Sequence, residues 1–179
     1  MNNKIEQLKE QWDKWDKSWN SEEAYKRFVE KYLKDNLKNL TLEEYTNIKT
    51  SDNEEYFTHW LERKTENCGK FRTASSYAYG IYKVNPNNIQ DENEKKHAEN
   101  KYKAFNENMK KSKDYLDEEN ARKYFENTVR PIIVALANYD DIDNNQRAKT
   151  TRPLDINYAR KIAYMYNVDK LIPIFKKEV

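Results

Sequence analysis

Aromatic rings are the feature that most constrains the fold of this chain. Its 179 residues include 14 tyrosines, 6 phenylalanines and 4 tryptophans, whereas hydrophobic residues of all kinds make up 37% and charged residues 36%. A mean hydropathy of -1.24 taken alone favours disorder. Each ring, however, buries about 150–250 Å² of surface when it packs. We therefore predict a folded chain whose core is built largely from rings.

Charge and cysteine content limit the classes of function. The 33 basic and 31 acidic residues leave a net charge of +2, so an anion-binding surface has to come from local clustering. The single Cys68 excludes an internal disulfide and a multi-cysteine metal site. The polar N-terminus and the lack of a long apolar run predict no signal peptide and no membrane span. We expect a soluble, cytoplasmic protein that needs no cofactor and no metal.

The spacing of apolar residues predicts helices in the first third of the chain. Residues 4–19 carry an apolar stripe that includes three tryptophans, and residues 21–33 carry a second stripe. We predict an antiparallel helix pair in a unit at 1–38, followed by an α+β domain at 39–179. Thr41 and Glu44 form a capping box that predicts a helix start at Leu42. Residues 54–65 are predicted to form a further helix that ends before Gly69.

The second half contains the predicted sheet. The alternation over Tyr77–Val84 indicates a strand, with Gly80 at a bulge or a close backbone approach. Residues 85–97 are predicted to be a loop, and helices are predicted over 98–109 and after Asp117, the latter kinked at Pro131. Residues 156–175 fit either period, and the turn at 167–169 favours a terminal hairpin. The expected fold is α+β, with helices around a small, mostly antiparallel sheet.

Residues 54–83, called here the aromatic-basic segment, differ in character from the rest of the chain. Basic side chains alternate there with rings, and Glu66 is the one acidic residue between Thr65 and Val84. Basic groups neutralise phosphates, and rings stack on exposed bases for about 1–3 kcal/mol each. The predicted phosphate-binding residues are Arg63, Lys64, Lys70, Arg72 and Lys83. The predicted base-stacking or base-pocket residues are Trp60, Tyr77, Tyr79 and Tyr82. The hydroxyls of Thr73, Ser75 and Ser76 add candidate phosphate or sugar contacts. The alternative is that these rings form the core of the sheet.

Signals for catalysis are weak. Two glycines cannot build a phosphate-binding loop, and His59 and His97 have no companion ligands at a metal-binding spacing. A nucleophilic thiol would have to be Cys68 with one of these histidines, and the competing interpretation is an inert buried thiol. We therefore predict that the chain is not an enzyme.

Four stretches together suggest a family. They are LTLEEYT at 40–46, YFTHWLE at 56–62, SSYAYGIYK at 75–83, and RKIAYMY followed by LIPIF within 160–175. In this order they resemble the N-terminal domain of McrB-like restriction proteins, which are AAA+ motor proteins of bacterial restriction systems. This chain departs from the pattern at 70–74, where Lys-Phe-Arg-Thr-Ala replaces a glycine-rich approach to the third stretch.

The resemblance implies a function and partners. It implies a domain that recognises double-stranded DNA, reading a target sequence or a modified base flipped into an aromatic pocket, on behalf of a motor and a separate McrC-like nuclease subunit. The sequence ends where that motor would begin, so we expect a domain of a longer protein or a standalone relative. The alternative function is a protein-interaction module, using the tryptophan stripe or the C-terminal edge strand, without nucleic-acid binding.

Overall fold

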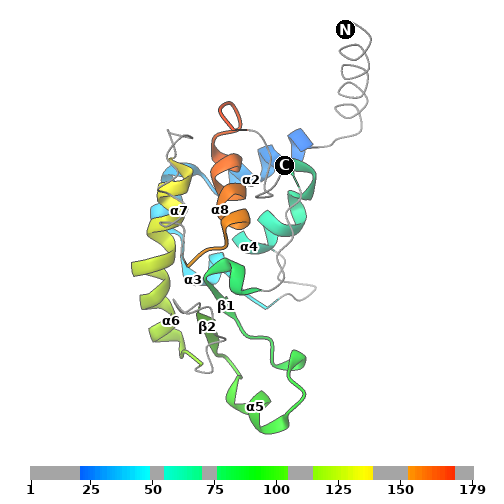
Figure 1. The fold of residues 1–179 in the computed structure, drawn as a ribbon, viewed down its shortest axis with the longest axis vertical. Helices are drawn as coiled ribbons and strands as arrows, with labels where there is room; N and C mark the ends of the chain where they lie inside the picture. Colours follow the sequence, from blue (N-terminus) through cyan, green and yellow to red (C-terminus); the bar gives the residue numbers. More distant parts are fainter. Residues whose placement is uncertain (1–20, 49–54, 70–75, 105–114, 139–152, 172–179) are drawn as a thin grey trace, which may run out of the picture.

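The computed structural model describes residues 21–48, 55–69, 76–104, 115–138 and 153–171, and shows an α+β fold in which helices surround a two-stranded antiparallel sheet (Figure 1). The first half contains α2 (Ser21–Lys31), η1 (Lys34–Asn39), α3 (Leu42–Tyr45), α4 (Phe57–His59), η2 (Trp60–Lys64), η3 (Glu66–Cys68) and η4 (Ser76–Tyr79). The second half contains β1 (Ile81–Lys83), η5 (Pro86–Asn88), α5 (Glu92–His97), β2 (Tyr102–Ala104), α6 (Glu118–Tyr124), η6 (Phe125–Val129), α7 (Arg130–Ala137) and α8 (Ile156–Tyr166).

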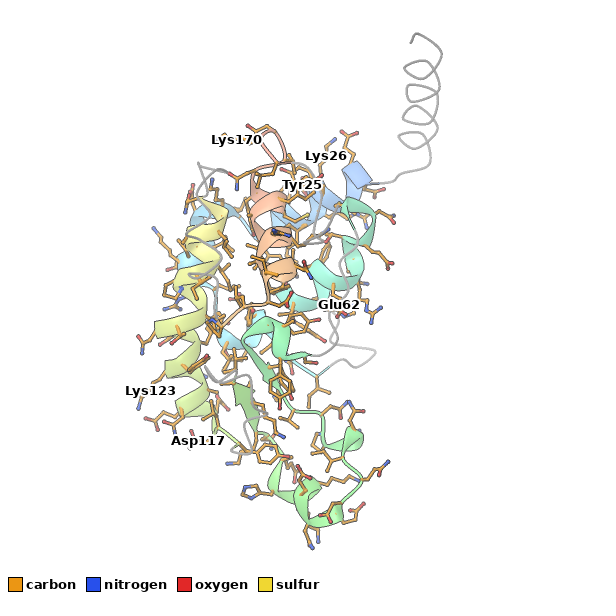
Figure 2. The ribbon with its side chains drawn as sticks, in the orientation of Figure 1. Tyr25, Lys26, Glu62, Asp117, Lys123 and Lys170 are labelled. Carbon is orange, nitrogen blue, oxygen red and sulfur yellow. The ribbon has the colours of Figure 1, made fainter. Side chains whose placement is uncertain are left out.

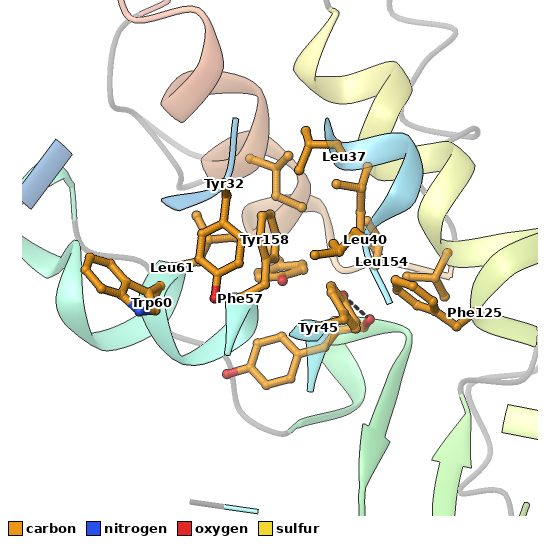
Figure 3. Close-up of a cluster of buried hydrophobic side chains, with 14 of the residues drawn as sticks. Tyr32, Leu37, Leu40, Tyr45, Phe57, Trp60, Leu61, Phe125, Leu154 and Tyr158 are labelled. Carbon is orange, nitrogen blue, oxygen red and sulfur yellow. Dashed lines mark hydrogen bonds between the residues drawn. The ribbon is translucent and has the colours of Figure 1, made fainter. Parts of the chain in front are cut away.

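The largest fully buried side chains of the core are aromatic rings, in keeping with the composition. Phe28, Tyr45, Phe57, Phe125 and Tyr158 are fully buried. The ring of Tyr45 lies 4.9 Å from that of Phe125 and 5.8 Å from that of Phe57, measured between centroids. Figure 3 shows Tyr45, Phe57 and Phe125 together with Leu37 of η1 and Tyr158 of α8. Rings from both halves of the chain therefore meet in one core.

In the N-terminal third, two expectations are confirmed: a helix that begins at Ser21 and the capping box of Thr41 and Glu44. Residues 21–31 form α2, while residues 4–19, which carry the tryptophan stripe, lie outside the described residues. Phe28 and Leu37 pack into the same core as residues from beyond position 39. The capping box at the start of α3 is present: the Glu44 amide donates to the Thr41 hydroxyl at 3.2 Å, and the Thr41 amide donates to the Glu44 carboxylate at 2.9 Å.

The predicted strand at 77–84 is wrong over its first half. Ser76–Tyr79 is a 3-10 turn, and the strand is limited to Ile81–Lys83. Gly80 separates the two with φ of +77°, a backbone conformation that other residues rarely adopt. A Cβ atom on Gly80 would lie 3.1 Å from the Leu154 side chain. The prediction of a close backbone approach at Gly80 is therefore confirmed, but the approach ends a turn rather than interrupting a strand.

The segment between the two strands contains more structure than its polarity suggests. β1 pairs with β2 in antiparallel register, with Ile81 opposite Ala104 and Lys83 opposite Tyr102. The predicted loop at 85–97 contains η5 and α5, and Asp91 caps α5 by accepting hydrogen bonds from two backbone amides. The predicted helix at 98–109 is wrong over its described part, where residues 102–104 form β2. Figure 1 shows the segment that contains α5 extending away from the other helices.

The predicted C-terminal hairpin is wrong over residues 156–166, which form the helix α8. The Asp155 side chain caps the helix by accepting from the Asn157 amide at 2.8 Å. Tyr158, Ile162 and Met165 follow one face of α8 and are fully buried. Helical periodicity therefore decides the structure, because it places these three side chains in the core at once. Pro173 and the rest of 172–179 lie outside the described residues.

The long helical stretch after Asp117 accommodates Pro131 by changing its hydrogen-bonding pattern. Asp117 caps α6, as expected, by accepting from the Asn120 amide. The five residues of η6 form a π-helical turn before α7 begins at Arg130, with Pro131 in its first turn. Proline lacks an amide hydrogen and is tolerated there. None of the helices in the described parts of the chain combines the length and the apolar character needed to cross a lipid bilayer.

Candidate functional site

The aromatic-basic segment contributes most of the lining of a polar pocket with a volume of about 310 Å³. Its walls come from the end of α3, from α4 and η2, and from η4 and β1. The lining residues are Thr46, Asn47, Tyr56, Thr58, His59, Glu62, Arg63, Ser76, Tyr79, Tyr82 and Lys83. Hydroxyl, amide and charged groups dominate this set, so the pocket is suited to a polar ligand.

Helical periodicity explains how α4 and η2 build both core and pocket. Phe57, Trp60 and Leu61 are buried in the core, whereas Glu62 and Arg63 line the pocket. The helix ends in a π-helical turn, in which the Thr65 amide donates to the carbonyl oxygen of Trp60 at 2.9 Å. Residues three or four positions apart share one helix face. The pocket wall is thus fixed by the same helix that anchors the core.

Glu62 is held in place by two neighbours. The Tyr79 hydroxyl donates to Glu62 Oε2 at 2.6 Å, and the Arg63 guanidinium lies 3.7 Å from Glu62 Oε1. Tyr79 is itself fixed, because its ring packs edge-on against Tyr158 with centroids 4.9 Å apart and its carbonyl accepts the Tyr45 hydroxyl at 2.6 Å. Figure 2 shows Glu62 at the side of the molecule, away from the long α6–α7 helix. A carboxylate therefore stands at a defined position in the pocket.

The strand β1 contributes Tyr82 and Lys83 to the lining of the pocket, and Tyr77 packs against Tyr82. The rings of Tyr77 and Tyr82 meet edge-to-face with centroids 5.3 Å apart. Burial and then the contact with Tyr77 raise the pKa of Tyr82, so its hydroxyl stays protonated at neutral pH. The Lys83 amide donates to the Thr46 hydroxyl at 3.4 Å, which ties β1 to the end of α3. The protonated hydroxyl of Tyr82 and the side chain of Lys83 thus line the same pocket as Glu62.

The structure brings together two of the five predicted phosphate-binding residues. Arg63 and Lys83 both line the pocket. Lys64 is exposed on the same turn as Arg63 but stands outside the lining, and Lys70 and Arg72 fall outside the described residues. Arg63 is 64% exposed, so its guanidinium can reach a ligand at the pocket mouth.

The four predicted base-binding rings fall into two groups. Tyr82 is half-buried in the pocket wall and Tyr77 packs against it. Tyr79 lines the pocket, but its ring is only 7% exposed and it presents mainly its hydroxyl. Trp60 is 8% exposed in the core cluster, and its indole donates to Glu55 Oε2 at 2.9 Å. The interpretation of Trp60 as a stacking platform is therefore corrected: it is a core residue.

Sequence reasoning missed several pocket residues. These residues include Thr46, Asn47, Thr58 and Glu62. His59 also lines the pocket, although the sequence singles it out only as a possible metal ligand or as a partner of the Cys68 thiol. The signal was present in the helix, because positions 58 and 62 and positions 59 and 63 are each four apart and so share a face. Tertiary contacts bring Thr46 and Asn47 to the pocket, and no local sequence pattern predicts this position. Ser76, named for its hydroxyl, does line the pocket.

Other chemistry at the site has little support. Within the described ranges, no group of three or more His, Cys, Asp or Glu side chains is arranged to hold a metal ion. Cys68 is 3% exposed, and burial raises the pKa of its thiol. A nucleophilic cysteine acts as the thiolate, which this environment disfavours. The arrangement thus favours ligand binding over nucleophilic catalysis at Cys68.

Comparison with known proteins gave no match, whether with protein-family models, curated proteins or solved structures.

Proposed function

We propose that this chain is the DNA-recognition domain of a restriction system, and that its pocket receives a nucleotide of the target. The observation that carries this proposal is the convergence of Arg63, Lys83 and Tyr82 on one polar pocket. All three come from the aromatic-basic segment, in which rings and cations alternate. Cations at a pocket mouth attract the phosphate backbone, while a ring in the wall offers a surface to an unstacked base.

Pocket size and chemistry are consistent with this ligand. A volume of about 310 Å³ lies at the lower end of the range for small-molecule sites, which is roughly 300–1,000 Å³. Enzymes and readers that need access to a base extrude it into such a pocket, at a cost of a few kcal/mol. Hydroxyl groups of Thr46, Thr58 and Ser76 provide donors and acceptors for sugar or base edges.

The biological setting of the proposal comes from the sequence resemblance alone. In McrB-like proteins, such a domain selects the target for an AAA+ motor that works with a separate nuclease subunit. This chain would then contribute recognition of double-stranded DNA, and the motor and nuclease would contribute the remaining activities. Whether the base is modified is decided by comparing methylated and unmethylated duplexes in the same assay.

Fluorescence anisotropy with labelled duplex and single-stranded DNA tests the proposal. We expect salt-sensitive binding that weakens several-fold in Arg63→Ala and in Lys83→Ala, with the slope of log affinity against log salt reduced by about one in each. Arg27→Ala is the matched control, because Arg27 is 66% exposed, against 64% for Arg63, and is also paired with a glutamate. Its affinity should stay at the wild-type value.

Two results would count against DNA recognition. One is the absence of binding to every DNA at low salt. The other is equal weakening by Arg27→Ala and Arg63→Ala, which would indicate a diffuse charge effect rather than a pocket. Absence of DNA binding together with self-association in light scattering would support the alternative of a protein-interaction module.

A further inference from the structure

The pocket contains one group that a phosphate-binding site would avoid, and this is the carboxylate of Glu62. Glu62 lines the pocket together with Arg63 and Lys83, and its side chain is 28% exposed. A carboxylate repels phosphate, so we expect the phosphates of a bound nucleotide at the two cations rather than beside Glu62. The carboxylate instead calls for a ligand atom that donates a hydrogen bond.

We propose that Glu62 selects the base held in the pocket by accepting hydrogen bonds from its amino group. This inference rests on the proposed function, because it assumes that a base enters the pocket. Cytosine presents an amino donor where uracil and thymine present a carbonyl acceptor. A carboxylate attracts the first and repels the second. The pocket therefore takes amino-bearing bases in preference to uracil or thymine.

The geometry around Glu62 supports a selecting role. The Tyr79 hydroxyl uses one acceptor site on Oε2, at 2.6 Å, whereas an ionised carboxylate offers about four. The Arg63 guanidinium, at 3.7 Å from Oε1, is an ion-pair partner beyond ordinary hydrogen-bond length. Acceptor capacity thus remains on a side chain whose position is already fixed.

Tyr79 is the positioning residue for this carboxylate. Its hydroxyl holds Glu62, while its ring is packed against Tyr158 and its carbonyl accepts the Tyr45 hydroxyl. The chain of contacts therefore runs from the fully buried Tyr45 and Tyr158 to the pocket. A carboxylate that is already held in place loses little conformational freedom when a ligand binds. More of the hydrogen-bond energy is therefore left to distinguish a base with an amino group from one with a carbonyl group.

Single-stranded oligonucleotides of equal length, one all-deoxycytidine and one all-deoxyuridine, provide the direct test with the whole chain. The two carry the same number of phosphates and pyrimidine rings of the same size, and their bases differ at the hydrogen-bonding edge. Hydrogen bonds to charged groups are strong enough for a preference of about tenfold for the deoxycytidine strand. The assay is anisotropy at neutral to mildly alkaline pH.

Three variants assign the preference to Glu62. In Glu62→Gln the ratio of the two affinities should fall to near one, because the amide presents a donor as well as an acceptor. In Glu62→Asp the charge remains but the carboxylate is withdrawn by one methylene, so most of the preference should also disappear. Glu119→Gln removes an equal charge from an exposed glutamate on α6 and should keep the wild-type ratio. Thermal unfolding of each variant confirms that it is folded.

The outcomes separate the inference from the proposed function. Salt-sensitive binding with equal affinity for the two strands would overturn the role of Glu62 and leave DNA recognition in place. A preference that persists in Glu62→Gln and Glu62→Asp would do the same. If neither strand nor any duplex binds, the proposed function fails and the inference fails with it. A ratio of about tenfold that is lost in both Glu62 variants and kept in Glu119→Gln supports both.

Discussion

Two groups of tyrosines, one in the core and one at the pocket, differ in what surrounds them. Tyr45 and Tyr158 are fully buried, and Tyr79 links them to the pocket. Tyr77 and Tyr82 are half-buried and pack edge-to-face at the pocket side. Both groups consist of tyrosines, so the residue type alone does not distinguish them. The difference shows that in this chain a tyrosine is assigned to core or to pocket by its position on an element, not by its local sequence.

Lys161 and Lys83 also differ in their environments. Lys161 of α8 is fully buried, and its amine donates to the carbonyl oxygens of Thr65 and Gly69, each at 2.8 Å. Lys83 lines the pocket and its amine lies 5.8 Å from the centroid of the Tyr102 ring. The first lysine links α8 to the turn that follows η2, whereas the second lies at the pocket. Core and pocket variants should therefore separate loss of stability from loss of binding.

The largest effect is expected in the core, from Phe57→Ala. Phe57 is fully buried against the rings of Phe28, Tyr32 and Tyr45, and removal of such a ring costs about 3–5 kcal/mol of unfolding free energy. Urea denaturation followed by circular dichroism measures the loss. Phe57→Leu, which keeps most of the apolar volume, should lose clearly less. A loss below about 1 kcal/mol for Phe57→Ala would contradict the packing described here.

The second effect is a pH dependence that Lys161 produces. Burial lowers the pKa of Lys161 to about 8, whereas an unfolded lysine titrates near about 10.4. Below about pH 8 both states hold the proton. Between these two values the unfolded state binds more protons, so the free energy of unfolding rises with pH, by about 2 kcal/mol up to about pH 9.5.

Urea titrations at several pH values measure this rise, and Lys161→Met should abolish it. A control at the surface is Lys123→Met, since Lys123 is 63% exposed on α6 and should leave the rise intact. Tyrosines such as the half-buried Tyr166, whose pKa is raised by burial, oppose the trend above about pH 10, where unfolded tyrosines begin to ionise. Identical slopes in wild type and Lys161→Met would show that Lys161 is not responsible.

The sequence predicted much of the fold because several signals were local. The capping box of Thr41 and Glu44 and the cap at Asp117 depend on residues within one helical turn. The stripe of α2 follows the helical period and confirms the predicted helix. Local chemistry of this kind needs no knowledge of the rest of the chain.

The errors occur where tertiary contacts decide between two local possibilities. Residues 156–166 fit both periods, and the burial of Tyr158, Ile162 and Met165 on one face selects the helix. Residues 102–104 lie in a sparse helical pattern, yet pairing with β1 makes them a strand. The aromatic-basic segment lines most of the pocket, as its composition led us to expect. Trp60 was wrongly predicted to bind a base, because composition does not show which face of a helix packs into the core.

The third effect tests the start of α3, which connects core and pocket. Thr41→Ala removes the hydroxyl that accepts from the Glu44 amide and should cost about 1 kcal/mol of unfolding free energy. α3 places Tyr45 in the core and ends next to Thr46 of the pocket, so DNA affinity should also decline slightly. Urea denaturation and anisotropy measure the two quantities. Thr41→Ser retains a capping hydroxyl and should restore most of the stability, and failure to do so would argue against the cap.

The smallest effect on stability is expected at the pocket wall, from Tyr82→Leu. Tyr82 is half-buried and contacts Tyr77, so the cost in unfolding free energy should be near that of a surface substitution, about 0.5 kcal/mol. Loss of the ring should nevertheless weaken DNA binding by about 1 kcal/mol or more if a base stacks on it. Tyr82→Phe keeps the ring and should bind nearly as wild type. This pair of variants separates the two groups of tyrosines most sharply, because a ring that matters for binding and little for stability belongs to a site. If Tyr82→Leu instead lost stability on the scale of Phe57→Ala and kept full DNA affinity, Tyr82 would have to be counted with the core.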